Sequence, residues 1–324
     1  MIEKIILFII NSIIVLAINT KSYNVAKKFN LLDYPSKNKI HILPTPFVGG
    51  IIIYLLLFTC FVTSVLSNFD LNTYLFFYIS AFFVLGFIDD KFNLNSYYKI
   101  LLVFLISIIF IFLDDSFLIS KIFFSISNTE YYFGKLKIPV TIICILLLYV
   151  SMNMSDGINC LLISFTATLL ILINILVLKR NLGYIDISLL SSLTTLLYFN
   201  YKNKIFLGNA GANLLCAYFI YILINSNYYS SIDVFEVISV FLIMGIDMVR
   251  LIFIRLFNKL NPFDRDLNHF HHILSKKFNV EITIVVYLIL SFIPLILHYL
   301  TSISTVVYIP IQILIYSIII YKLR

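Results

Sequence analysis

The segment YKILLVFLISIIFIFL, residues 98–113, is apolar almost throughout and carries one charged side chain, Lys99. An α-helix rises about 1.5 Å per residue, so about 20 apolar residues cross the hydrocarbon layer of a membrane. A run of this length and composition predicts a membrane-spanning helix.

The rest of the chain repeats this pattern. Of its 324 residues, 61% are hydrophobic and 12% are charged, and the mean hydropathy is +1.02. This composition excludes an ordinary soluble domain. The predicted fold is all-α, a single polytopic transmembrane domain over residues 1–324 with about 11 helices. The apolar runs lie near 2–20, 48–67, 73–88, 98–113, 138–153, 158–178, 187–201, 210–226, 234–256, 282–300 and 304–321.

Basic residues indicate which side of the membrane each loop faces. With the amino terminus outside, six of the 23 basic residues fall in outer loops and the other 17 in inner loops. This imbalance fits the positive-inside rule and places the carboxyl terminus in the cytoplasm. The longer polar stretches then all lie on the cytoplasmic side, at 21–47, 89–99, 150–158, 200–212 and 257–281.

Two pairs of adjacent carboxylates flank the run at 98–113. GFIDDKFNL (86–94) contains Asp89 and Asp90, and LDDS (113–116) contains Asp114 and Asp115. Ionisable groups at membrane depth cost several kcal/mol, so they are usually functional or placed at the water boundary. We assign Asp114 and Asp115 to the outer surface. Asp89 and Asp90 have two possible interpretations, a functional role or a solvated helix end, and both stay open.

Two further polar segments interrupt the apolar runs. NMSDGINCL (153–161) would place Asn153, Asp156 and Asn159 roughly on one face if it is helical, and an ordinary polar turn is the alternative. FLGNAGANLL (206–215) precedes the eighth run. Glycines at a helix start leave backbone N–H groups pointing outward, which favours an anionic ligand, although a plain helix-start turn explains the segment equally well.

The richest polar stretch is DMVRLIFIRLFNKLNPFDRDLNHFHHIL, residues 247–274. Asp247 and Arg250 can pair because they stand three residues apart on a helix. Arg265 and the histidines at 269, 271 and 272 follow in a long loop. No further ligand stands at a spacing typical of zinc. Phosphate binding therefore explains the histidine density better, since His and Arg both offer N–H donors.

Taken in order, five segments resemble those of the polyprenyl-phosphate N-acetylhexosamine-1-phosphate transferases of glycosyltransferase family 4. They are KIHILPTPFVGGI (39–51), DDKFNLNSYYK (89–99), NMSDGINCL (153–161), FLGNAGA (206–212) and PFDRDLNHFHHIL (262–274). The H-x-H-H arrangement is similar to the branch that starts O-antigen (lipopolysaccharide), common-antigen or teichoic-acid-type glycans. The resemblance implies transfer of a sugar-1-phosphate from a UDP-N-acetyl amino sugar to undecaprenyl phosphate, with release of UMP.

The resemblance also implies a cofactor, partners and a location. The ion is Mg²⁺, with Mn²⁺ as an alternative, and the active site faces the cytoplasm from a bacterial inner membrane. Partners are the lipid bilayer, the two substrates and, as an open alternative, a second copy in a homodimer; no nucleic acid is expected.

Matching positions carry over the family's functional residues. The resemblance assigns catalysis to Asp89, Asp90 and Asp156, and a metal site to Asp89, Asp90 and Asn209. It assigns substrate binding to Lys39, His41, Lys99, Asn153, Asn159, Arg265, His269, His271 and His272.

Four positions depart from the family pattern. Val150 stands where an asparagine is usual, Asn159 where many members have a second aspartate, and Cys160 where a glycine is usual. Asn209 stands where the family has an aspartate that binds magnesium. An asparagine offers a neutral carbonyl in place of an anionic oxygen and should weaken a site for a hard cation.

Two other functions compete with catalysis. A transporter or flippase for lipid-linked sugars would also have many spans, but transporters place binding groups near the bilayer midplane. A weakened or non-catalytic family member would bind substrate without turning it over. Release of UMP separates both alternatives from an active transferase.

Overall fold

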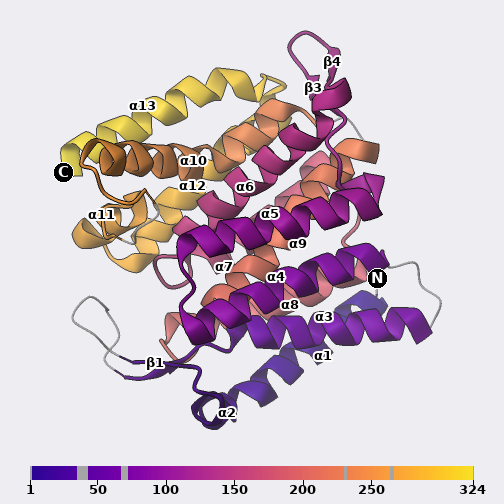
Figure 1. The fold of residues 1–324 in the computed structure, drawn as a ribbon, viewed down its shortest axis with the longest axis vertical. Coiled ribbons are helices and arrows are strands. Elements are labelled where there is room, and N and C mark those ends of the chain that lie inside the picture. Colours follow the sequence, from indigo (N-terminus) through magenta and orange to yellow (C-terminus); the bar gives the residue numbers. More distant parts are fainter. Residues whose placement is uncertain (1, 35–42, 67–71, 230–231, 263–265, 324) are drawn as a thin grey trace. The chain divides into compact units, whose positions relative to one another are not determined.

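The computed structural model describes residues 2–34, 43–66, 72–229, 232–262 and 266–323, and most of them are helical (Figure 1). A π-helical turn, Ile173–Val177, extends α7, and short 3₁₀ turns lie at Asp115–Phe117 and Gly134–Leu136. The helices are α1 (Ile2–Asn19), α2 (Ser22–Phe29), α3 (Gly49–Leu66), α4 (Thr73–Phe92), α5 (Ser96–Leu113), α6 (Lys137–Ser155), α7 (Leu161–Leu172), α8 (Tyr184–Tyr201), α9 (Gly208–Tyr229), α10 (Val234–Phe257), α11 (Phe270–Lys277), α12 (Val280–Thr301) and α13 (Thr305–Leu323).

Each predicted apolar run coincides with one of these helices. Within the described ranges, eight helices are long and apolar enough to cross a membrane: α1, α3, α5, α6, α9, α10, α12 and α13. The prediction of a helical, multi-pass membrane protein is therefore confirmed. The number of spans and their orientation stay predictions.

The chain folds as two compact units, both assembled from segments that are distant in sequence. Unit 1 contains Met1–Leu102, Leu162–Ile175 and Lys179–Tyr218, and unit 2 contains Val103–Leu161, Leu176–Leu178 and Phe219–Arg324. The units are interleaved along the chain, so neither corresponds to a continuous stretch of sequence. The single domain expected for residues 1–324 stays a prediction.

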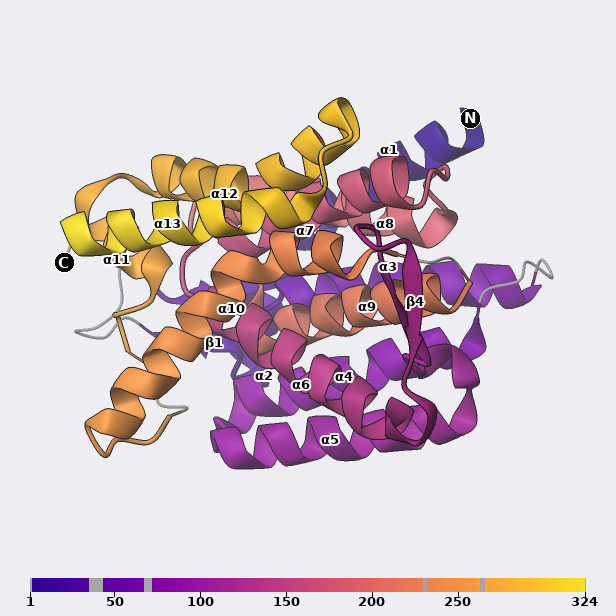
Figure 2. The same cartoon turned by 90° about the horizontal axis from the view of Figure 1, so that it is seen from above.

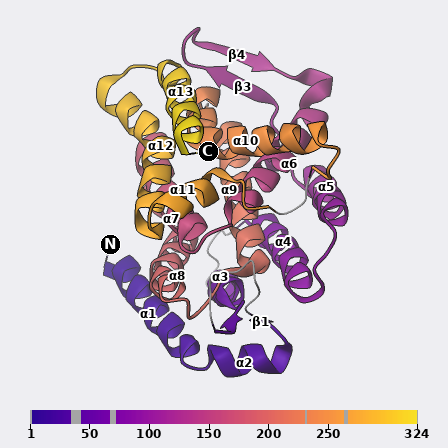
Figure 3. The same ribbon diagram turned by 90° about the vertical axis from the view of Figure 1, so that its left-hand side faces the viewer.

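In unit 1, α8 packs against both α1 and α3 (Figures 1 and 3). Polar side chains link the three helices inside this packing. The Asn11 amide donates to the Ser188 hydroxyl at 3.0 Å, and the Cys60 thiol lies 2.8 Å from the same hydroxyl. In an apolar bundle such interhelical hydrogen bonds stabilise the packing by about 0.6–2 kcal/mol.

In unit 2, α10 packs against α6, α12 and α13, and α11 lies against α12 and α13 (Figure 2). The buried Gln312 side chain of α13 joins these helices. Its amide nitrogen donates to the backbone carbonyls of Ser239 at 2.9 Å and Leu290 at 2.7 Å. This helix group carries the polar loop that leads to α11.

Several short elements in the polar loops were not expected from the sequence. Strands β1 (Leu32–Asp33) and β2 (Thr45–Pro46) form one antiparallel pair, and β3 (Lys121–Phe124) and β4 (Thr129–Tyr132) form a hairpin. The hairpin has aromatic and β-branched residues, which favour strands, and Asn128 takes a positive φ of 51° at its turn. Helices α2 and α11 have only eight residues each, so their stability depends on tertiary contacts.

We predict that Gly50→Ala destabilises unit 1, because a Cβ at residue 50 would lie 2.1 Å from the backbone nitrogen of Gly211 in α9. Overpacking of this kind costs about 1–3 kcal/mol. The matched control is Gly245→Ala, since a Cβ there meets nothing within 4 Å. Thermal unfolding in detergent should give a lower Tm for Gly50→Ala only, and equal Tm values for the two variants would contradict the packing.

Candidate functional site

In unit 1, Asp90 at the end of α4 caps the amino terminus of α9. One oxygen, Oδ1, accepts from the backbone N–H of Asn209 at 2.8 Å and from the Asn209 side-chain amide at 2.9 Å. The other, Oδ2, accepts from the backbone N–H of Ala210 at 2.9 Å. The first N–H groups of a helix have no intrahelical partner and carry partial positive charge, so they stabilise a carboxylate at this position.

Glycines allow this close approach of α4 and α9. Gly208 has a φ of +74°, a left-handed conformation that favours glycine, and a Cβ there would lie 2.8 Å from Oδ2 of Asp90. A Cβ on Gly86 of α4 would lie 2.3 Å from the carbonyl oxygen of Asn209. Gly208, the first glycine of the FLGNAG segment, is therefore required by backbone geometry.

Asp89 forms a buried ion pair with Lys99. The Lys99 ammonium lies 2.6 Å from Oδ2 of Asp89, and the backbone N–H of Leu94 donates to Oδ1 at 2.9 Å. The two charged residues are only 1% and 8% exposed. Each charge compensates the other, so removing one would leave an uncompensated buried charge.

The segment before α3 also meets the start of α9. Backbone N–H groups of Gly49 and Gly50 donate to the carbonyls of Phe206 at 3.0 Å and Leu207 at 2.9 Å. Three of the five polar segments are thereby in contact within unit 1. The sequence-predicted residues Lys39 and His41 lie outside the described residues.

The arrangement of Asp89, Asp90 and Asn209 does not fit an open magnesium site. Oδ1 of Asp89 and both oxygens of Asp90 accept hydrogen bonds from the protein, and Oδ2 of Asp89 forms the ion pair with Lys99. The Asn209 amide turns its nitrogen toward Asp90. Hard cations require oxygen ligands. Across the ranges that the structure describes, no group of three His, Cys, Asp or Glu side chains could hold a metal ion. The metal assignment of these residues stays a prediction.

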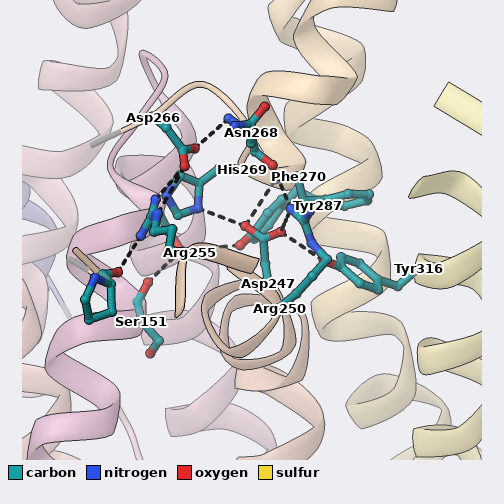
Figure 4. A network of polar contacts seen from close by, with 12 residues as sticks. Ser151, Asp247, Arg250, Arg255, Asp266, Asn268, His269, Phe270, Tyr287 and Tyr316 are labelled. Atoms are coloured by element: carbon teal, nitrogen blue, oxygen red, sulfur yellow. Dashed lines mark hydrogen bonds and ion pairs between the residues drawn. The ribbon is translucent and has the colours of Figure 1, made fainter. Parts of the chain in front are cut away.

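In unit 2, a buried carboxylate organises the histidine segment (Figure 4). Oδ1 of Asp247 accepts from Arg250 at 2.7 Å and from the Tyr316 hydroxyl at 2.9 Å. Oδ2 lies 2.9 Å from Nδ1 of His269 and accepts from the backbone N–H of Phe270 at 3.1 Å. The predicted pairing of Asp247 with Arg250 is confirmed. The contacts of Asp247 with α11 and α13 join residues distant in the chain and could not be predicted from the local sequence.

A second buried side chain holds the loop that precedes α11. Arg255, 3% exposed, donates through Nε and Nη2 to Asp266 at 3.1 and 2.9 Å, and through Nη1 to the carbonyl of Pro262 at 2.7 Å. Arg255 thus holds this loop at Pro262 and at Asp266. Arg265, which the sequence predicts to bind substrate, lies outside the described residues.

The three histidines lie together, with ring centroids between 4.3 and 6.4 Å apart. His271 is buried, and a Cβ on Gly157 would lie only 2.1 Å from its Nε2. Burial lowers the pKa of His271 well below its usual range, and the positive charge that His272 and His269 can carry adds to this effect. Burial, with smaller effects of His269 and Lys276, lowers the pKa of His272 to about 4. Both rings are neutral at pH 7.

The segment around Asp156 is a turn, so of the two interpretations left open by the sequence the polar turn is confirmed. Helix α6 ends at Ser155, and the backbone N–H of Asp156 donates to the carbonyl of Asn153 at 3.3 Å. Asn153, Asp156 and Asn159 are all partly exposed. The left-handed φ of 68° at Cys160 is a conformation that favours glycine, the residue that is usual there in the family. Gly157, the residue after Asp156, thus lies against the ring of His271.

Comparison with known proteins adds to this geometry. The probable undecaprenyl-phosphate N-acetylglucosaminyl 1-phosphate transferase of Bacillus subtilis (strain 168) is 27% identical over 281 residues, 84% of this chain and 77% of the relative. The undecaprenyl-phosphate alpha-N-acetylglucosaminyl 1-phosphate transferase of Thermotoga maritima is 28% identical over 259 residues, covering 78% and 75%. The protein of the same name from Escherichia coli (strain K12) is 23% identical over 263 residues, covering 78% and 71%.

A family model matches residues 72–227, a range that contains Asp89, Asp90, Asp156 and Asn209. Its description is glycosyl transferase family 4. The motifs, the helical membrane fold and these similarities agree, and residues 72–227 of the chain match glycosyl transferase family 4.

Proposed function

We propose that the protein transfers a sugar-1-phosphate from a UDP-N-acetyl amino sugar to undecaprenyl phosphate and so starts a lipid-linked cell-surface glycan. An oxygen of the acceptor phosphate attacks the phosphorus that bears the sugar, and the bond from that phosphorus to UMP breaks. The products are UMP and a lipid-linked diphosphate sugar. The names of the three relatives, which all specify undecaprenyl phosphate and an N-acetylglucosaminyl 1-phosphate group, support this reaction.

The observation that carries the proposal is that the five polar segments gather in two groups, one within each unit. In unit 1, Asp90 contacts Asn209, and Gly49 contacts Phe206. In unit 2, His271 packs on Gly157, beside Asp156. A protein that only needed solvated loops between spans would not bring such distant polar segments into contact. Enzymes that act on phosphates need this density of donors and charges.

In this proposal Asp89, Asp90 and Asp156 act at the reacting phosphates. Lys99, Asn153, Asn159, Arg265 and the three histidines bind substrate. Two anions must approach each other, so positioning and charge compensation supply most of the catalysis. The Lys99 ammonium has three donors and can share them between Asp89 and a phosphate. The proposed active site faces the cytoplasm from a bacterial inner membrane.

The direct test mixes membranes containing the protein with undecaprenyl phosphate and a panel of labelled UDP-sugars, and measures UMP. We expect UMP together with a labelled lipid product that depends on the acceptor. A transporter would release no UMP, and binding of a UDP-sugar without UMP would identify a non-catalytic member.

We predict that Asp89→Asn loses UMP release, because the carboxylate that holds the Lys99 ammonium is gone. Breaking a buried pair also costs about 3–5 kcal/mol of stability. The double variant Asp89→Asn/Lys99→Gln should regain stability, measured as Tm in detergent, without regaining activity. The control Asp114→Asn should stay active, because an asparagine can still accept from the N–H of Ser116. An active Asp89→Asn would remove Asp89 from the mechanism.

Magnesium remains part of the proposal, and we predict an unusually high requirement because of Asn209. In Asn209→Asp, a second carboxylate would stand where the amide now donates to Asp90 at 2.9 Å. The two like charges should lower the Tm in EDTA, and added Mg²⁺ should restore it more than in the wild type. Half-maximal UMP release should need less Mg²⁺ in the variant. Identical responses of the two proteins, in Tm and in activity, would contradict this prediction.

A further inference from the structure

Asp247 fixes one of the three histidines in a defined orientation. Nδ1 of His269 lies 2.9 Å from Oδ2 of Asp247, and that oxygen also accepts from the backbone N–H of Phe270 at 3.1 Å. A carboxylate can only accept, so Nδ1 carries the hydrogen of this contact. Nε2 is then the functional end of the ring, and no described group forms a hydrogen bond with it.

The other oxygen of Asp247 is held just as firmly. Arg250 donates to it at 2.7 Å and Tyr316 at 2.9 Å, and Arg250 also donates to the carbonyl of Asn268 at 2.6 Å. Asp247 is 4% exposed and therefore has little freedom to turn. The imidazole of His269 is consequently oriented by helices α10 and α13 as well as by its own backbone (Figure 4).

We propose that Asp247 is a positioning residue, which holds His269 so that its protonated Nε2 donates a hydrogen bond to a phosphate oxygen of the bound UDP-sugar. This inference rests on the proposed function. Phosphate oxygens accept and cannot donate, so only an Nε2 that carries hydrogen can bind one. With Nδ1–H directed at Asp247, a hydrogen on Nε2 as well makes the ring an imidazolium, which forms an ion pair with the adjacent carboxylate.

The neighbouring histidines cannot take the same role. Nε2 of His271 is fully buried against Gly157, and no described group forms a hydrogen bond with it. Neither His271 nor His272 has a carboxylate as hydrogen-bond partner among the described residues. Nε2 of His271 thus lies beside the Asp156 turn without a polar partner, whereas the Nδ1–H of His269 is already held by Asp247.

The charged and titratable groups around His269 come from each element packed near it. Asp247 and Arg250 belong to α10, Asp266 to the preceding loop, and His271, His272 and Lys276 to α11. Tyr287 of α12 and Tyr316 of α13 face Asp247. Among these groups, Asp247 is the carboxylate in hydrogen-bond contact with the ring.

A double-mutant cycle for UDP binding tests the inference. Asp247→Asn, His269→Gln and the double variant are compared with the wild type in detergent at one pH. A hydrogen bond between charged groups is worth roughly tenfold to hundredfold in affinity, and each single variant should lose that much. The double variant should bind about as weakly as His269→Gln alone, because Asp247 acts through His269. Equal losses from Asp247→Asn in both backgrounds would overturn the proposal.

Gln312→Leu is the control for a merely structural role. It removes the two hydrogen bonds from Gln312 to the carbonyls of Ser239 and Leu290 but leaves the contact of Asp247 with His269. We expect a lower Tm with UDP affinity unchanged. A loss of affinity equal to that of Asp247→Asn would show that affinity only follows stability, and would overturn the specific role of His269.

The split between KM and kcat for the UDP-sugar gives an independent readout. Asp247→Asn and His269→Gln should raise KM by the same factor, whereas a merely structural loss would lower the amount of active enzyme and leave KM unchanged. A wild type that binds UDP but releases no UMP would overturn the proposed function. The double-mutant cycle would still test the role of Asp247, because it measures UDP affinity and does not need turnover. A wild type that does not bind UDP would overturn both.

Discussion

A carboxylate buried in an apolar helix bundle must find its hydrogen-bond donors inside the protein, and this requirement shapes both units. An isolated ionised group in such surroundings would cost several kcal/mol. Asp89 is compensated by the ammonium of Lys99, and Asp90 by the first N–H groups of α9. Asp247 is compensated by four donors from three elements. These three carboxylates are therefore held in fixed positions by the protein.

This rigidity suits chemistry between two anions. Neither phosphate can be drawn to the other by charge, so the protein must supply fixed donors and fixed cations beforehand. Helix ends serve this purpose well, because their N–H groups are already oriented and need no reorganisation. Unit 1 uses a helix end to hold Asp90, and unit 2 uses a buried carboxylate to hold an imidazole.

Local sequence predicts the helices well and the polar contacts poorly. Apolar runs long enough to span a membrane are a property of neighbouring residues, and each of them coincides with a helix. The short helix α11 and the β3–β4 hairpin are too small to produce such a signal, and long-range packing stabilises them. The contact of Asp90 with Asn209 joins residues far apart in the chain. Only Asp247 and Arg250, one helical turn apart, could be paired from spacing alone.

The contact between His271 and Gly157 has an evolutionary consequence. The imidazole occupies the space that any larger side chain at position 157 would need, so residue 157 cannot become larger while the histidine stays. A lineage that enlarges residue 157 must first lose the ring at 271, and the intermediate protein would contain a cavity at the Asp156 turn. The glycine and the histidine should therefore be inherited together, although they lie far apart in sequence.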